Sequence, residues 1–239
     1  MLLAAGIIIL AYRIRLRENP TMNKVTTAVE AVKAIRDGDT VLVGGFLRAG
    51  CPEMLIGALL EFSDASDLTV VSNDLGTAEM NMFKLQSAGR IKKVHGSYVG
   101  ANPMTGKMLF ADPDSVTLWP QGTLAEKLRA GGAGIKGFYT PVGVGTVVEE
   151  GKEKRTFDGV DYLLEMGMKG NVALIKAAVT DKAGNCFMRG TAKNFGALMA
   201  RAADYVVVEA QRIVEVGEID PEIVTVPGIF VDAIVPSEE

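Results

Sequence analysis

The chain has 239 residues, of which 48% are hydrophobic and 23% charged, and its formal charge is −4. These proportions are typical of a globular domain and exclude a collagenous, disordered or disulfide-stapled chain. The negative charge argues against a general nucleic-acid binder, which needs a basic face for the phosphates. With one histidine and two cysteines, the chain is poorly equipped for a histidine metal site, a Ser-His-Asp triad or a Cys-His dyad. No metal site is predicted, and a reducing compartment is expected.

The first 21 residues are predicted to be an N-terminal extension outside the fold. Residues 2–12 are continuously apolar and are followed by Arg13, Arg15 and Arg17. A bilayer span needs about 20 apolar residues, and a secretory signal carries its positive charge before the apolar stretch. Two interpretations remain, a weak membrane anchor or residues upstream of the natural start at Met22. We favour the second, so no membrane partner is predicted and residues 22–239 form the domain.

The first half of this domain alternates between helix and strand. Thr27 can cap a helix that Asp37-Gly38 ends, and Pro52 can begin a second helix that runs to Phe62. A third helix is expected over residues 124–130. Short apolar runs, typical of strands buried on both faces, are found at residues 41–43, 68–72, 91–94 and 116–119. This alternation predicts a parallel sheet with helices on both faces.

The second half predicts further strands, some of them antiparallel. Asp158-Gly159, between residues 155–157 and 162–164, is typical of a β-hairpin. Residues 172–179 form a long apolar run, which residues 185–189 could join after a turn at 181–184. A helix at 197–203 precedes a strand at 205–208. No repeat or linker is evident, so we predict an α/β fold with a single mixed, mostly parallel sheet flanked by helices.

The first candidate site is a glycine-rich loop that follows the strand at residues 41–43. Glycines at the carboxyl end of a buried strand let a ligand approach the backbone closely and contact its N–H groups. The loop lacks both the Gly-x-Gly-x-x-Gly fingerprint and the Gly-Lys-Ser/Thr of a P-loop, and a tight turn without a ligand is the alternative. Its residues are Gly44, Gly45, Phe46, Leu47, Arg48, Ala49 and Gly50.

Other candidate residues follow the remaining strands. Gln121 lies between a strand and a helix and has a donor and an acceptor free to bind a carboxylate, although it could instead cap the helix. Asn73 and Asn102 follow strands at the same edge and could line a pocket, although both types are common in turns. Residues 130–146 include six glycines, which predict a long, tightly folded turn containing Gly132 and Gly134. His95 and Cys51 are expected to be structural.

Taken together, these motifs resemble the family I CoA-transferases, in particular their A (alpha) subunit of the acetate/butyrate–acetoacetate type. The first loop follows the family's N-terminal signature: Asp-Gly, two free positions, three apolar residues, Gly-Gly-Phe, three free positions, Gly, one free position, Pro. Further matching blocks lie at residues 100–103, 120–123, 131–134, 143–150, 193–195 and 227–228. The resemblance covers residues 22 to about 235.

The resemblance implies a fold related to the sugar-phosphate isomerases and an enzyme that moves coenzyme A from an acyl-CoA to a short-chain carboxylate. In the family a glutamate attacks the thioester, and a glutamyl-CoA thioester follows in a ping-pong sequence. That glutamate lies in a Ser-Glu-Asn-Gly block of the B (beta) subunit, and this chain has no such block. No catalytic nucleophile is therefore predicted here. An ionised glutamate needs no general base, in accord with a chain that has one histidine.

The roles carried over are CoA binding by residues 44–50, orientation of the carboxylate by Gln121, and shaping of a shared cleft by the glycines at 131–134. Arg48 could meet a CoA phosphate or face solvent. The resemblance also implies a beta-subunit partner, a heterotetramer, a cytoplasmic location, and no permanent cofactor, with coenzyme A or acyl-CoA bound as substrate. Two alternatives stay open: a sugar-phosphate isomerase or regulatory sugar-phosphate-binding protein on the same fold, and a non-catalytic subunit that only stabilises its partner.

Overall fold

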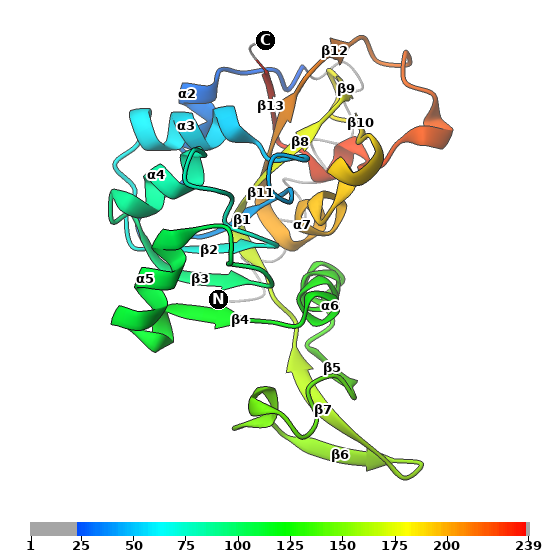
Figure 1. The fold of residues 1–239 in the computed structure, drawn as a ribbon. Coiled ribbons are helices and arrows are strands. Elements are labelled where there is room, and N and C mark those ends of the chain that lie inside the picture. The colour runs from blue at the N-terminus through cyan, green and yellow to red at the C-terminus, as the bar shows by residue number, and fades with distance from the viewer. Residues whose placement is uncertain (1–22, 238–239) are drawn as a thin grey trace, which may run out of the picture.

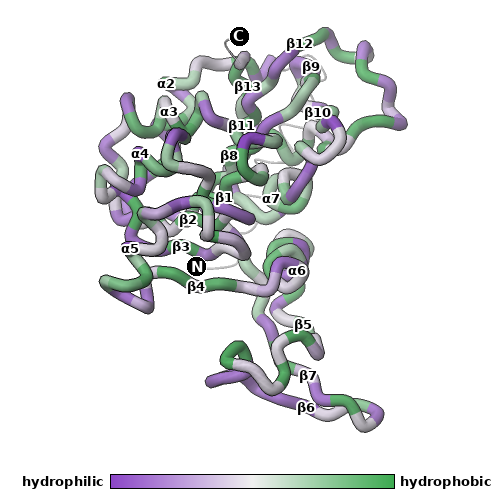
Figure 2. The backbone as a smooth tube through the Cα atoms, viewed as in Figure 1, coloured by the Kyte–Doolittle hydropathy of each residue, from purple (hydrophilic) through white to green (hydrophobic). Residues whose placement is uncertain are grey.

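A computed structural model describes residues 23–237, so the predicted extension at 1–21 lies outside the described residues. The core is a seven-stranded parallel sheet in the order β13-β11-β8-β1-β2-β3-β4 (Figure 1). Its strands are β1 (Thr40–Val43), β2 (Leu68–Ser72), β3 (Ile91–Gly96), β4 (Val116–Leu118), β8 (Gly170–Ala177), β11 (Ala203–Ala210) and β13 (Ala233–Pro236). Figure 2 shows that β8 and β11 are mostly hydrophobic, as strands inside a sheet covered on both faces should be.

Helices cover both faces of this sheet, as the alternation predicted. One face carries α2 (Ala28–Val32), α3 (Glu53–Phe62), α4 (Asn81–Ser87) and α5 (Pro103–Ala111), and the other carries α6 (Gln121–Gly132) and α7 (Gly196–Ala202) (Figure 1). The pleat of β1 divides its side chains between the two layers. Val41 and Val43 pack in the core beneath α3, whereas Leu42 packs in the core beneath α6 and α7.

The predicted α/β fold with a mostly parallel main sheet is confirmed, but the remaining strands form two small sheets of their own and do not join it in a single mixed sheet. β9 (Val179–Asp181) pairs with β10 (Cys186–Phe187) and β12 (Ile213–Val214). β5 (Gly137–Thr140), β6 (Lys154–Phe157) and β7 (Val160–Met166) form the second, which extends away from the main sheet as an arm (Figure 1). The predicted hairpin at Asp158-Gly159 joins β6 and β7, and both turn residues have positive φ. The strand expected over 172–179 ends as β8 at Ala177 and resumes as β9.

Residues 130–146 are not the single long turn that the glycines predicted. Gly131 and Gly132 are the last residues of α6, and residues 137–140 are strand β5. Close packing explains the helical glycines, since a Cβ on Gly131 would lie 1.9 Å from the Met168 carbonyl oxygen and one on Gly132 2.9 Å from the Arg201 backbone. Here glycine is needed for contact between chain segments and not for a turn. The helices α4 and α5 were not predicted.

Candidate functional site

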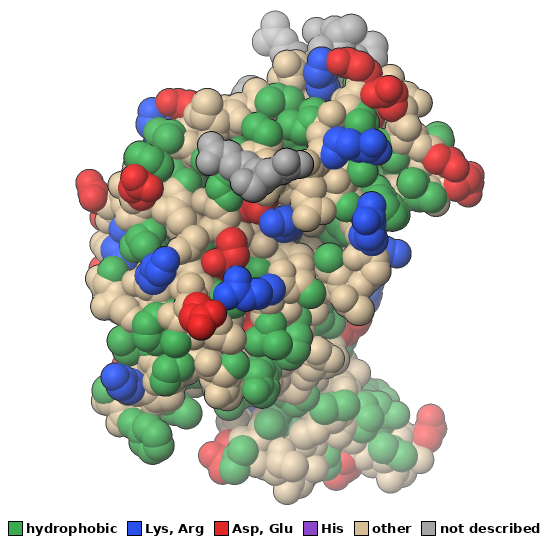
Figure 3. All heavy atoms as spheres, turned by 45° about the horizontal axis from the view of Figure 1, so that its top comes forward, with side chains coloured by type: hydrophobic (Ala, Val, Ile, Leu, Met, Phe, Trp, Pro, Cys, Tyr) green, Lys and Arg blue, Asp and Glu red, His purple; other side chains and the backbone are tan. Residues whose placement is uncertain are grey.

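The strand order places the glycine-rich loop at the switch point of the sheet. From β1 the chain adds β2, β3 and β4 on one side, and then returns to add β8, β11 and β13 on the other. The loop at 44–50 leaves the carboxyl end of β1, where β1 pairs with β8, and Gly44 N–H donates to Leu174 O at 2.9 Å. In open α/β sheets this is the position at which ligands bind. Figure 3 shows acidic and basic side chains intermixed on one face, without a patch of a single sign.

Residues 44–50 form a tight turn, called here the 44–50 turn. Phe46 and Ala49 exchange two backbone hydrogen bonds of 3.0 Å, and Leu47 between them has φ +51°. Gly45 and Gly50 have φ of +100° and +73°. A Cβ on Gly45 would lie 2.6 Å from the Cys51 nitrogen, and one on Gly50 would lie 2.3 Å from Ala192 O. Both glycines are therefore required, and the turn is packed against the segment at residues 190–194.

The 44–50 turn leads into α3, whose first turn already holds an anion from the protein. The Glu209 carboxylate, on β11, accepts N–H from Met54 at 3.0 Å and from Leu55 at 3.3 Å. Lys176 donates to the same carboxylate at 2.7 Å. Because this carboxylate occupies the helix N-terminus, a ligand at the turn cannot use these two amides of α3. Arg48 is exposed and pairs with Glu79 at 3.1 Å.

Asn73 and Gln121, predicted separately, are in contact. Gln121 is the first residue of α6, and its Nε2 donates to Asn73 Oδ1 at 3.3 Å. Ser97 Oγ donates to the same oxygen and to the Asn73 carbonyl. Asn73 is 1% exposed, yet its Nδ2 has no hydrogen-bond partner among the residues that the structure describes. A buried donor without a partner is costly, so it marks a place where a ligand oxygen would be stabilised.

The other predicted residues are placed differently. Asn102 caps α5, where its Oδ1 accepts N–H from Met104 and Thr105 while its Nδ2 donates to Leu75 O at 2.9 Å. Gly132 and Gly134 lie at the far end of α6, about 16 Å along the helix from Gln121 at 1.5 Å per residue. A direct ligand contact by Asn102, Gly132 or Gly134 stays a prediction.

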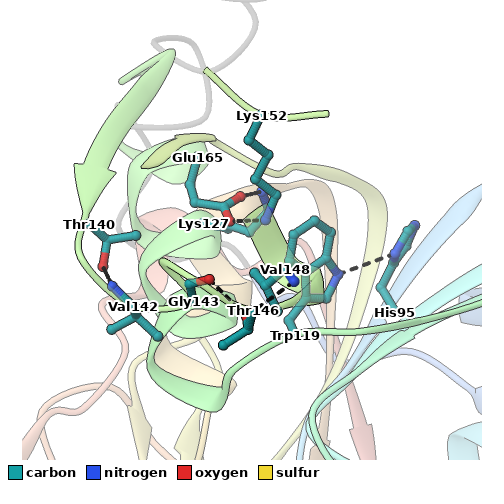
Figure 4. A network of polar contacts seen from close by, with 10 residues as sticks. All are labelled: His95, Trp119, Lys127, Thr140, Val142, Gly143, Thr146, Val148, Lys152 and Glu165. Carbon is teal, nitrogen blue, oxygen red and sulfur yellow. Dashed lines mark hydrogen bonds and ion pairs between the residues drawn. The ribbon is translucent and has the colours of Figure 1, made fainter. Parts of the chain in front are cut away.

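A buried ionic cluster beside this edge was not predicted (Figure 4). Glu165 on β7 is 2% exposed, accepts a hydrogen bond from Lys127 Nζ on α6 at 2.7 Å and also pairs with Lys152. Lys127 Nζ lies 4.0 Å from the centre of the Trp119 ring, and Trp119 Nε1 donates to His95 Nδ1 at 3.3 Å. Burial lowers the pKa of His95, and the nearby lysines lower it further, so this imidazole is neutral at pH 7.

This cluster fixes the segment that leads to Gln121. Trp119 is held on its face by lysine ammonium groups and at its edge by His95, and Pro120 and Gln121 follow it directly. Lys152, which precedes β6, is largely buried against Glu165. The sequence held one indication that Glu165 is buried. Side chains alternate between the two faces of a strand, so Glu165 lies on the same face as the buried Leu163.

The fold and the contacts define an α/β protein whose candidate site residues gather where the loops after its first four parallel strands meet. A profile of the coenzyme A transferase family matches residues 25–237, so the chain belongs to this family. It is 46% identical to the A subunit of a probable succinyl-CoA:3-ketoacid coenzyme A transferase of Bacillus subtilis, over 90% of both chains. It is 44% identical to the alpha subunit of the acetate CoA-transferase of Escherichia coli K12, over 90% of this chain and 98% of that one.

Solved structures share the fold. The apoenzyme of the acyl-CoA transferase YdiF from Escherichia coli O157:H7 matches with a TM-score of 0.81 and 23% identity, over 92% of this chain and 48% of that one. Glutaconate coenzyme A-transferase from Acidaminococcus fermentans matches with a TM-score of 0.78 and 21% identity, over 90% and 75%. The chain therefore spans about half of YdiF, whereas its two relatives of similar length are single subunits of the alpha or A type. Among residues 23–237 no helix is long and apolar enough to cross a membrane.

Proposed function

We propose that this chain is the CoA-binding alpha subunit of a transferase that moves coenzyme A between an acyl-CoA and a short-chain carboxylate of the acetate, butyrate and acetoacetate class. A relative that is 44% identical over 84% of this chain is the acetoacetyl-CoA:acetate/butyrate CoA transferase alpha subunit of Clostridium acetobutylicum. In this proposal the 44–50 turn holds the CoA, and Gln121 and Asn73 orient the carboxylate or thioester oxygen. The active form is a heterotetramer with beta subunits.

The unpartnered Nδ2 of Asn73 carries this proposal. It is buried beside the first turn of α6, where Gln121 Nε2 donates to the Oδ1 of the same Asn73 side chain. An oxygen that gains negative charge as the thioester is attacked would bind such donors more strongly than the neutral thioester does. The α6 N-terminus adds a favourable partial positive charge, and no side chain of the described residues caps that end.

The attacking glutamate is proposed to come from the beta subunit. Among the described residues, two buried carboxylates lie next to the 44–50 turn, and both are already held by donors. Glu209 accepts the α3 amides and Lys176, and Asp74 accepts the Leu47 and Gly76 amides. A nucleophile must be free to form an acyl anhydride and then a thioester to CoA, with the CoA thiolate leaving and returning. Neither carboxylate is free in that sense.

The test is CoA transfer from acetoacetyl-CoA to acetate, measured with this chain alone and with this chain assembled with a CoA-transferase beta subunit. Transfer is expected only from the complex. Transfer by the isolated chain would refute the assignment of the nucleophile, and a covalent CoA thioester on any acidic residue of this chain would do the same. No transfer by a well-assembled complex would contradict the proposed function and would leave stabilisation of the partner as the explanation.

Gln121→Ala tests the carboxylate site within the active complex. Loss of a hydrogen bond to a charged oxygen should lower kcat/KM for acetate by about ten- to a hundredfold. Gln211→Ala, which removes an exposed glutamine after β11, is the matched control and should leave kcat/KM unchanged. Equal kcat/KM values for the two variants would contradict the assignment of Gln121 to the carboxylate site.

A further inference from the structure

Asp74 connects the two parts of the proposed site, the 44–50 turn and the Asn73–Gln121 pair. It follows Asn73 at the end of β2, is 6% exposed, and its Oδ1 accepts the Leu47 N–H at 3.0 Å. Its Oδ2 accepts the Gly76 N–H of its own loop at 3.2 Å. Because Asn73 contacts Gln121 and Asp74 contacts the 44–50 turn, neighbouring residues reach both parts of the site.

The bond to Leu47 falls on the most strained residue of the turn. Leu47 has φ +51°, in the left-handed region that costs energy for any residue with a Cβ. The two backbone hydrogen bonds within the turn join Phe46 and Ala49, so the turn itself provides no acceptor for the Leu47 N–H. A charged acceptor on this amide offsets the cost, and it also fixes the turn against β2.

Two backbone amides offset part of the cost of burying the Asp74 carboxylate. Burial raises the pKa of Asp74 above its ordinary value, and the hydrogen bonds from the Leu47 and Gly76 amides reduce this rise without cancelling it. None of the described lysines or arginines forms an ion pair with this carboxylate. Burying this carboxylate costs folding free energy. Its position is therefore better explained by a role in fixing the geometry of the turn, through the Leu47 amide, than by a gain in stability.

We propose that Asp74 is a positioning residue that holds the 44–50 turn in its CoA-binding conformation through the Leu47 amide. The inference rests on the proposed function and adds a residue that touches neither substrate. Without the carboxylate, the Leu47 N–H loses its acceptor and the turn can relax away from its strained conformation. Acyl-CoA then binds less tightly, whereas the carboxylate site at Gln121 keeps its own contacts.

Asp74→Ala in the active complex tests this inference. The KM for acyl-CoA should rise by about tenfold or more, while kcat and the KM for acetate change by less than about threefold. Asp74→Asn keeps a neutral acceptor for Leu47 and should give a smaller rise. Asp181→Ala is the matched control, since Asp181 is 2% exposed and accepts the Asn185 N–H at 2.9 Å in another loop. It should leave both KM values unchanged.

An active wild-type complex in which Asp74→Ala keeps the wild-type KM for acyl-CoA would overturn the inference, and so would an equal rise in both KM values. An inactive wild-type complex would instead contradict the proposed function. If Asp74→Ala does not fold, amide hydrogen exchange in the wild-type complex decides. The Leu47 amide should exchange at least about tenfold more slowly than the exposed Arg48 amide, and equal exchange overturns the inference.

Discussion

Glu165→Gln should destabilise the chain strongly, because Glu165 is the shared counter-charge of two lysines. Glu165 is 2% exposed, and Lys127 and Lys152 both donate to it. Removing one member of a buried ionic group while the opposite charge stays buried costs about 3–5 kcal/mol. For a domain of this size, about 2–4 °C per kcal/mol converts this to a loss of about 6–20 °C in Tm.

The assay is thermal unfolding of this chain by itself, followed by Trp119 fluorescence. Trp119 is the one tryptophan in the sequence, and its ring lies against both lysines, so its emission reports the cluster directly. Glu126→Gln is the matched control, because Glu126 lies on α6 next to Lys127 but pairs with Arg129 at the surface. Such a pair contributes little, and its loss should leave Tm unchanged. Equal Tm values for the two variants would refute the view that Glu165 is an ionised, buried partner.

Two further predictions concern the 44–50 turn and the two cysteines. Gly45→Val should abolish CoA transfer while the chain still binds its beta subunit, because a φ of +100° and a Cβ 2.6 Å from the Cys51 nitrogen leave no room for a side chain. Normal transfer by this variant would show that the turn is not part of the CoA site. Cys51 and Cys186 should resist a thiol reagent at pH 7 in the native chain and react after denaturation. Burial raises the pKa of Cys51 and raises that of Cys186 to about 12, so both thiols are protonated, and rapid native labelling would contradict this environment.

The sequence was informative where a local pattern determines the structure. Three apolar residues followed by glycines predicted the strand and the turn that carries Leu47, and both are found in the structure. Asn73 and Gln121 could each be placed at the end of a strand. The carboxyl ends of parallel strands share one edge, so the fold class places both residues at that edge. Only the structure shows the hydrogen bond that joins them across 48 positions.

Contacts between distant segments could not be predicted in this way. Glu209 caps α3 from a strand more than 150 positions away, and nothing in the sequence around either element indicates the pair. The glycines that end α6 look like turn residues in the sequence, and only the approach of Met168 shows that they serve packing. In both cases the determining atom belongs to an element whose position depends on the whole fold.

The site that we propose on this chain is preorganised by contacts within the chain itself. Leu47, Asp74, Asn73 and Gln121 form one connected path across the loops after β1, β2 and β4. The unpartnered Asn73 Nδ2 costs about 1–3 kcal/mol in the free protein, and in our proposal a substrate oxygen that accepts its hydrogen bond would recover this energy. Such a donor favours an anionic oxygen over a neutral one, so the proposed site would bind an attacked thioester more strongly than the resting thioester.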